Sequence, residues 1–291
     1  MSTRRSIAAL TVLTVAGGAA VYGMYVLAAS PDRGEPSGSC TVALDGATAT
    51  LTAEQAGNAA LISAASARLG LPARGATIGI ATAMQESSLV NIDYGDRDSI
   101  GLFQQRPSQG WGTVEQIMDP YYSADTFYAA LVKVHGWQDM AVTVAAQTVQ
   151  RSAFPDAYAT REAGARLWAS ALRGYSGAVA VDCDVAAGPG TTAAAFVERL
   201  ERDFGAGTYA VRPLTADDDA IWIDVVPVDG TQASRDAAAA WTVAVAGTES
   251  VEAVANRAEG WERGTGLTAV AAPASSLGVA VRLLPLEAAQ G

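Results

Sequence analysis

Residues 84–107 read MQESSLVNIDYGDRDSIGLFQQRP, and this stretch decides the fold predicted for the first half of the chain. An apolar run at helical spacing ends at Glu86, a polar and acidic segment follows, and then comes Gly-Leu-Phe-Gln-Gln. A carboxyl group in the last turn of a helix faces the negative end of the helix dipole and lies among apolar neighbours, and both disfavour its charged form. We therefore expect a raised pKa for Glu86, which suits a proton donor near neutral pH.

The sequence on both sides of this stretch is typical of helices. Thr52 and Gln55 form a capping-box pair at the start of an alanine-rich run that reaches Leu69. Segment 91–112 holds several glycines and a proline, so it is predicted to be a loop or short strand beside the helices. Helices are predicted over 53–69, 74–87, 123–134, 143–151 and 155–172, with a short one that is capped by Thr113 and stops at Pro120.

Composition limits the class of protein. At 291 residues, with 50% hydrophobic and only 17% charged residues, the chain is expected to form two packed domains. The net charge of -11 disfavours nucleic acid as a partner, because phosphate binding needs a basic surface. The single histidine, His135, cannot build a multi-histidine metal site, and we expect neither a metal nor a cofactor.

Residues 1–30 predict the compartment. Arg4 and Arg5 precede an uncharged run from Ser6 to Ser30, which as a helix is long enough to cross the roughly 30 Å hydrocarbon core of a membrane. We expect a single retained N-terminal span, with its positive end inside and the rest of the chain extracytoplasmic. The alternative is a signal that is cleaved on export, which leaves a secreted protein.

The chain has two cysteines, Cys40 and Cys183, and they bracket the predicted helical region. In an oxidising compartment such a pair is expected to form a disulfide, whereas the alternative is two buried free thiols. Closing so long a loop stabilises the fold by at most about 5 kcal/mol on the chain-entropy model.

After Cys183 the character of the sequence changes. Residues 184–192 contain two glycines and a proline, which is typical of a linker. No catalytic-looking cluster follows, so we expect this part to position the protein at the cell wall or to bind a protein partner. The predicted elements are a helix over 192–204, strands over 208–214 and 220–228, a helix over 232–246 and strand-like segments within 267–284.

Three short motifs in the helical region resemble a known family. Glu86-Ser87 at a helix end is followed by Gly101-Leu102-Phe103-Gln104-Gln105 and then by Ala145-Ala146-Gln147. This order is similar to that of the soluble lytic transglycosylase and goose-type lysozyme family, whose signatures are Glu-Ser, Gly-Leu-Met-Gln and Ala-Tyr-Asn. The third motif departs from the family, because Ala146 and Gln147 replace the tyrosine and the asparagine. The resemblance covers residues 53–174.

The resemblance implies cleavage of the β-1,4 bond between N-acetylmuramic acid and N-acetylglucosamine in peptidoglycan. Glu86 inherits the role of single general acid and base, which yields a 1,6-anhydro end without consuming water. Tyr158 is a candidate to supply the missing hydroxyl, and Gln147 to replace the asparagine. The residues expected to bind the substrate are Ser87, Gly101, Leu102, Phe103, Gln104, Gln105, Gln147 and Tyr122.

Two alternatives to this activity remain open. Hydrolysis needs a second carboxylate about 6.5 to 9.5 Å from the first to hold a water, and Asp93, Asp96 and Asp98 are the candidates. A solvated turn whose charges support the loop is the competing interpretation of these three residues. The other alternative is a non-catalytic wall-binding or assembly protein that kept the fold as a sugar-recognition surface.

Taken together, the patterns and the resemblance predict a mainly α fold. A lysozyme-like helical domain follows an N-terminal membrane segment and precedes a small α+β domain. The predicted boundaries are 1–30 for the membrane segment, 31–44 for a linker, 45–183 for the helical domain, 184–192 for a second linker and 193–291 for the α+β domain.

Overall fold

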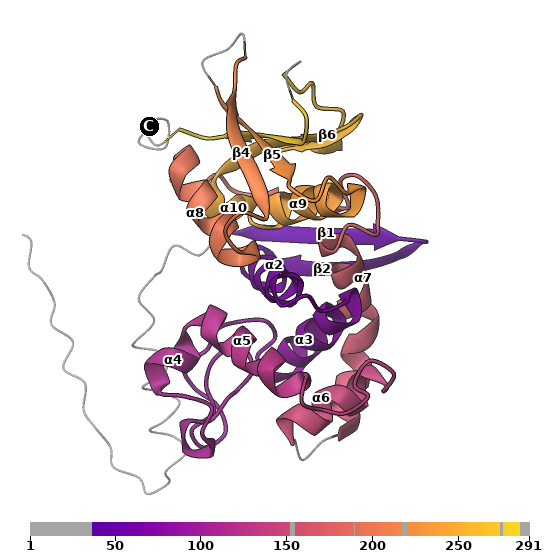
Figure 1. Cartoon of the computed structure of the whole chain (residues 1–291), viewed down its shortest axis with the longest axis vertical. Coiled ribbons are helices and arrows are strands. Elements are labelled where there is room, and N and C mark those ends of the chain that lie inside the picture. The colour runs from indigo at the N-terminus through magenta and orange to yellow at the C-terminus, as the bar shows by residue number, and fades with distance from the viewer. Residues whose placement is uncertain (1–36, 152–154, 189, 217–219, 274–275, 286–291) are drawn as a thin grey trace, which may run out of the picture. The chain divides into compact units, whose positions relative to one another are not determined.

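Antiparallel sheets as well as helices build this protein (Figure 1). The computed structural model describes residues 37–151, 155–188, 190–216, 220–273 and 276–285. It has 44% helix and 22% strand, with antiparallel sheets of three and six strands, so the fold is α+β and the prediction of a mainly α fold is wrong. The prediction failed because the strands around Cys40 are rich in alanine and threonine, which weakens their alternation of apolar and polar residues.

The first sheet joins the two ends of the helical region. Its strands are β1 (Gly38–Leu44), β2 (Ala47–Thr52) and β3 (Val181–Val185), in the order β2-β1-β3. Asp45 and Gly46 connect β1 to β2 with φ values of 51° and 80°, the two left-handed positions of a tight hairpin turn. Residues 38–44, which were expected to belong to a linker, therefore form a strand of this sheet.

The predicted disulfide between Cys40 and Cys183 is confirmed. The two cysteines lie directly opposite each other in the antiparallel register of β1 and β3. They are separated by 143 residues, so the bond closes the whole helical region onto one sheet. Backbone pairing and the covalent bond therefore hold the same two segments together.

Helices fill the chain between β2 and β3. They are α2 (Ala53–Arg68), α3 (Ala73–Glu86), α4 (Val114–Met118), α5 (Pro120–Leu131), α6 (Val142–Gln150) and α7 (Glu162–Leu172), with 3₁₀ segments η1 (Pro107–Gln109) and η2 (Pro155–Arg161). The capping box of Thr52 and Gln55 starts α2 as predicted. Helix α3 packs against α2, α6 and α7, and its Ile78 and Ile80 are fully buried. This central position explains why the carboxyl end of α3 lies among other elements.

The C-terminal part carries the larger sheet. Its strands are β4 (Tyr209–Leu214), β5 (Ile221–Pro227), β6 (Val251–Asn256), β7 (Glu259–Glu262), β8 (Gly266–Thr268) and β9 (Val279–Leu283), in the order β4-β5-β9-β6-β7-β8. Its helices are α8 (Ala193–Phe204), α9 (Gln232–Ala244) and α10 (Ala246–Glu249). Helix α9 contacts both β3 and β6, so it lies between the two sheets (Figure 1). Strands β6 and β7 were not among the predicted elements.

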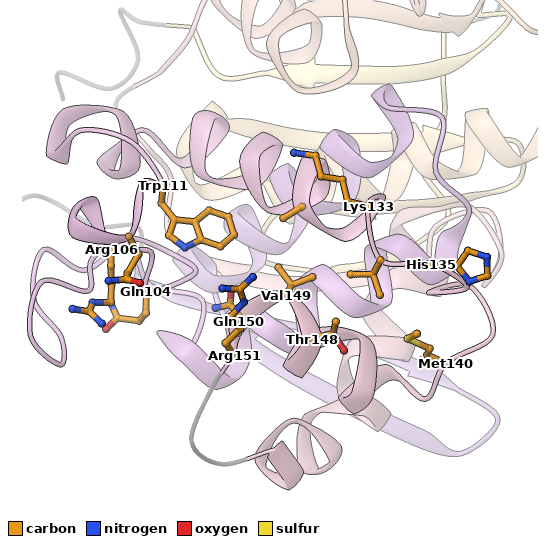
Figure 2. Close-up of a pocket in the computed structure, with 13 residues that line it drawn as sticks. Gln104, Arg106, Trp111, Lys133, His135, Met140, Thr148, Val149, Gln150 and Arg151 are labelled. Carbon is orange, nitrogen blue, oxygen red and sulfur yellow. The ribbon is translucent and has the colours of Figure 1, made fainter.

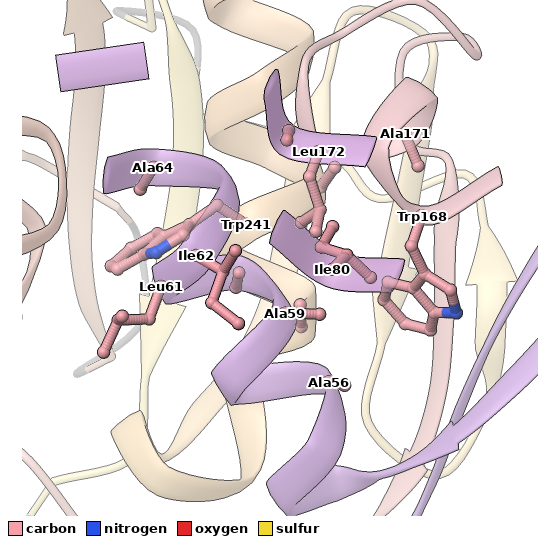
Figure 3. Close-up of a cluster of buried hydrophobic side chains, with 14 of the residues drawn as sticks. Ala56, Ala59, Leu61, Ile62, Ala64, Ile80, Trp168, Ala171, Leu172 and Trp241 are labelled. Carbon is pink, nitrogen blue, oxygen red and sulfur yellow. The ribbon is translucent and has the colours of Figure 1, made fainter. Parts of the chain in front are cut away.

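One buried apolar cluster extends across the helical region and the C-terminal part. Trp241 of α9 belongs to the same cluster as Ile62 of α2, and Trp168 of α7 packs near Ile80 of α3 (Figure 3). Asp203 of α8 adds a polar connection, because it accepts hydrogen bonds from Trp241 Nε1 at 2.6 Å and from the hydroxyl of Tyr121 at 2.6 Å. The C-terminal part is thus packed directly on the helices that surround α3.

The predicted membrane segment, 1–30, lies outside the described residues. Within the part of the chain that the structure describes, every helix is too short or too polar to span a bilayer.

Candidate functional site

Glu86 is the last residue of α3. The helix stops there because Ser88 and Leu89 adopt left-handed backbone conformations, with φ values of 54° and 61°. The amide of Leu89 donates to the carbonyl of Ala83 at 3.0 Å, which closes the end of the helix. The predicted position of the carboxyl group, in the last turn of a helix, is therefore the observed one.

Ser87 fastens the end of α3 to the Gly-Leu-Phe-Gln-Gln segment. Its side chain is buried, and its hydroxyl donates to the carbonyl of Leu102 at 2.8 Å. A second contact, to the carbonyl of Ala83 at 3.2 Å, keeps the hydroxyl on the helix terminus. Ser87 thus brings together two motifs that are fifteen positions apart in the sequence.

The Gly-Leu-Phe-Gln-Gln segment is anchored mainly by its buried side chains. Gly101 has φ of 78°, and a Cβ added there would lie 2.8 Å from the carbonyl oxygen of Ile117, so this position requires glycine. Leu102 and Phe103 are fully buried, and Phe103 stacks on Phe127 with ring centroids 4.5 Å apart.

The two glutamines of the segment have different surroundings. Gln105 is 1% exposed and donates to the carbonyl of Ser123 at 3.0 Å, so its side chain supports the loop. Gln104 is half-buried, has φ of 48°, and lines a cavity. Of the residues expected to bind substrate, Gln104 is therefore the one that reaches this cavity with its side chain.

Two side chains from distant segments meet the Glu86 carboxyl group. The hydroxyl of Tyr158, in η2, donates to Glu86 Oε1, and Gln150 of α6 also forms a hydrogen bond with the carboxyl group. Burial raises the pKa of Glu86 above its ordinary value, and the hydrogen bonds from Tyr158 and Gln150 oppose this rise only in part.

The cavity has a volume of about 660 Å³ and lies between α5, α6 and the loop that precedes α4. Figure 2 shows Gln104, Arg106 and Trp111 at one end, His135 and Met140 at the other, and Gln150 and Arg151 between them. Glu86 is not one of the lining residues. Gln150 connects the two, because it lines the cavity, bonds Glu86 and donates to the carbonyl of Phe103 at 2.7 Å.

The three candidate second carboxylates lie in the loop that follows α3. Asp98 accepts from the amide of Ser108 at 2.8 Å and from Arg106 Nε at 2.7 Å. Hydrogen bonds from Ser108 and from Arg106 hold the pKa of Asp98 well below its usual range. Asp93 and Asp96 are exposed. Asp98 therefore supports the loop in the way that the charged-turn interpretation describes.

The remaining predicted residues lie at the edges of this site. Gln147 is half-buried on α6, one turn before Gln150, and it does not line the cavity. The hydroxyl of Tyr122 donates to the carbonyl of Trp111 at 3.1 Å and so holds a residue of the cavity wall. The contact between Gln150 and Glu86 was not predicted, although Gln150 lies three positions after Gln147, a spacing that shares a helix face.

The described residues hold no group of three or more histidine, cysteine, aspartate or glutamate side chains placed to bind a metal ion. Neither a scan against protein-family models nor a search among curated proteins gives a match for this chain. The site is accordingly defined by its own geometry: a half-buried carboxyl group at a helix end, two hydrogen-bond donors and an adjoining cavity.

Proposed function

We propose that this protein is a peptidoglycan lytic transglycosylase and that Glu86 is its general acid and base. The observation that carries the proposal is the setting of Glu86. A half-buried carboxyl group ends α3, accepts hydrogen bonds from Tyr158 and Gln150, and is connected through Ser87 to the Gly-Leu-Phe-Gln-Gln segment. Such a group is protonated at higher pH than an exposed glutamate, which an acid catalyst of glycoside cleavage requires.

The reaction needs one carboxyl group that acts twice. Protonated Glu86 donates its proton to the glycosidic oxygen, and the bond between this oxygen and the muramic anomeric carbon breaks. The Glu86 carboxylate then takes the proton of the C6 hydroxyl of the same muramic residue. The oxygen of this hydroxyl forms a bond to the anomeric carbon. Glu86 is protonated again, no water is consumed, and the new end is a 1,6-anhydro sugar.

Tyr158 and Gln150 act on the charged form of Glu86. Both form hydrogen bonds that lower the pKa of the carboxyl group against the effect of burial. After the first proton transfer these donors stabilise the carboxylate, and they keep its oxygens in place for the second transfer. In this proposal Tyr158 takes the role of the tyrosine that is missing from the third motif.

The outcome of the reaction is tested with the full-length protein and purified peptidoglycan. We expect mass spectrometry of the released fragments to detect 1,6-anhydro ends, and the Glu86→Gln variant to release none. Glu162→Gln, at an exposed ion pair on α7, is the matched control and is expected to retain activity. Reducing ends would instead indicate a hydrolytic muramidase, and intact peptidoglycan with bound protein would indicate the non-catalytic alternative.

The proposed place of action is outside the cytoplasmic membrane. The disulfide between Cys40 and Cys183 favours an oxidising compartment, where peptidoglycan is also found. The uncharged run from Ser6 to Ser30 supports a single N-terminal span that holds the enzyme near its substrate. Fractionation of cells, with detection of the full-length or the shortened chain, distinguishes this anchor from a cleaved signal.

A further inference from the structure

The cavity beside Glu86 has a charge that contrasts with the rest of the molecule. The chain carries a net charge of -11, yet among the described residues that line this cavity there is no carboxylate. Its wall includes Arg106, Lys133, Arg151 and the single histidine, His135. A concave surface that gathers one sign of charge attracts ligands of the opposite sign, so the ligand that fits this cavity is an anion.

Two of these basic side chains, Lys133 and Arg151, are available to a ligand. Arg106 is already paired with Asp98 at 2.7 Å. In the described part of the chain, the ion pairs leave Lys133 and Arg151 without a carboxylate partner. Lys133 follows the end of α5 and Arg151 follows the end of α6, and Figure 2 shows the two side chains well separated. Two separate positive groups suit a ligand with more than one anionic group.

The apolar part of the wall narrows the class of anion. Val134, Met140, Val149 and Ala130 contribute carbon surface between the charged side chains, and Trp111 adds an aromatic ring. A phosphate polymer presents little apolar surface to such a wall. A short peptide that carries both alanyl methyl groups and free carboxylates matches carbon surface and cations together.

We propose that this cavity binds the peptide stem of peptidoglycan through the stem's carboxylates, with Lys133 and Arg151 as the recognition residues. This inference rests on the proposed function, because the stem is attached to the muramic residue whose bond Glu86 would cleave. Gln150 connects the cavity to Glu86, because it lines the cavity and forms a hydrogen bond with the Glu86 carboxyl group. A stem held in the cavity would place the sugar that bears it next to Glu86.

Binding is tested by calorimetry on the full-length Glu86→Gln variant, with a sugar-free stem peptide as the probe. We expect measurable binding of the peptide with free carboxylates and about tenfold weaker binding when these carboxylates are amidated. Adding Lys133→Gln and Arg151→Gln to the variant is expected to weaken binding of the free acid to a similar degree. Binding of the free acid is also expected to weaken as salt is raised, because both cations are near the surface.

Matched controls make each outcome decisive. Arg166→Gln removes a positive charge from an exposed ion pair outside the cavity and is expected to leave peptide binding unchanged. The denaturation midpoint of the Lys133→Gln/Arg151→Gln protein checks that it folds. Equal affinity for free and amidated peptide, or unchanged affinity after both substitutions, would overturn the proposal. Tighter binding of a poly(glycerol phosphate) than of the peptide would also overturn it.

The test separates this inference from the proposed function. Peptide binding is measured on a chain that lacks the Glu86 carboxyl group, so it does not require catalysis. If wild-type protein produces anhydro ends but no variant binds the peptide, the stem site is wrong and the activity stands. If the peptide binds as expected but wild-type protein releases no fragments, the activity is wrong and the cavity is a binding site for wall peptides.

Discussion

The hydroxyl of Tyr158 donates a hydrogen bond to Oε1 of Glu86, although the two residues are 72 positions apart. The bond connects η2 to the end of α3, and it is made in a region where burial disfavours the charged carboxyl group. A donor placed there stabilises the carboxylate without adding a charge. The pKa of Glu86 is therefore set by two opposing effects, burial and hydrogen bonding.

The first prediction concerns Tyr158→Phe, which removes this donor. We expect kcat/KM for the release of anhydro fragments to fall about 10- to 100-fold, because a hydrogen bond to a charged group contributes about 1.5 to 3 kcal/mol. The pKa of Glu86 should rise further, so the loss of activity on the alkaline side should move to higher pH. Steady-state rates measured over a range of pH check both the fall in kcat/KM and the shift of the pH profile.

The control for this prediction is Tyr175→Phe. Tyr175 is 63% exposed and does not line the cavity next to Glu86. It is expected to change neither the rate nor the pH profile. A Tyr158→Phe protein with lower activity but an unshifted profile would mean that Tyr158 supports the fold and does not tune Glu86.

The second prediction concerns the stability of Glu86→Gln. In the unfolded chain a glutamate has a pKa of about 4.3, and burial raises the pKa of Glu86 in the folded protein. The unfolded state therefore releases its proton more easily, and the folded state loses stability as pH rises between the two values. We expect Glu86→Gln to be more stable than wild type at pH 7, with the difference shrinking as pH falls from the raised folded pKa towards about 4.3, the value in the unfolded chain. Urea denaturation at several pH values measures the difference in the free energy of unfolding. A variant that is less stable than wild type at pH 7 would contradict the prediction.

The C-terminal end of α3 was predictable from sequence because its signals are local. The apolar spacing of α3, the capping box of α2 and the glycine at position 101 each lie within a few residues of the feature that they specify. The contact of Gln150 with Glu86 was not predictable in this way, because it depends on how α6 packs against α3. The mainly α prediction failed for a related reason: β1 and β3 pair across 143 residues, which no local pattern records.

One local signal for the first sheet was present in the sequence. Asp45-Gly46 between two short segments of alternating residues is typical of a tight hairpin, and it is the turn that connects β1 to β2. The residues before this turn were instead assigned to a linker, 31–44, and the first helix of the domain was predicted to start at Ala53. Strands β6 and β7 carry no turn as clear as this one, and their position in the larger sheet comes from pairing with β9 and β8.

The third prediction concerns the disulfide. A Cys40→Ala/Cys183→Ala protein loses the covalent bond across β1 and β3, and we expect the free energy of unfolding to fall by about 2 to 5 kcal/mol. Denaturation of the two proteins with and without a reducing agent measures the loss. The reducing agent should destabilise wild type to a similar degree and leave the double variant unchanged. An effect of the agent on the double variant would show that the comparison does not isolate this bond.

The fourth prediction concerns Asp203, which is fully buried where α8 meets the helical region. Its carboxylate pairs with Arg199 at 2.9 Å and accepts hydrogen bonds from Tyr121 and Trp241. Asp203→Ala removes every one of these contacts and leaves the half-buried Arg199 with its longer pair to Glu249, so we expect a loss of about 3 to 5 kcal/mol.

The comparison for Asp203 is Glu162→Gln, which breaks the exposed pair with Arg166. A surface pair at this helix spacing contributes about 0.3 to 0.5 kcal/mol, so this variant should be close to wild type. Urea denaturation followed by tryptophan fluorescence measures both proteins. Similar losses in the two variants would mean that the Asp203 contacts do not fasten α8 to the helices.

The last prediction is a dependence of stability on pH that comes from Asp224 in β5, far from the proposed chemistry. The carboxylate is buried, and burial alone would raise its pKa. Hydrogen bonds from the amides of Leu277 and Gly278 and from Arg212 outweigh burial and lower the pKa below its ordinary value. The stability that this carboxylate contributes is therefore complete above about pH 3.9, the value in an unfolded chain, and is lost as pH falls through the lower folded value.

Asp224→Asn tests this dependence, because the amide group cannot accept from all of these donors. We expect the variant to be less stable than wild type at pH 7 and the difference to narrow as the pH is lowered below about 3.9. Asp229→Asn is the matched control. Asp229 is exposed just before α9, so the loss of stability of this variant at pH 7 should be smaller. A constant difference between wild type and Asp224→Asn from pH 7 to pH 2 would mean that the Asp224 carboxylate is not stabilised by its donors, since only a titrating group makes the difference depend on pH.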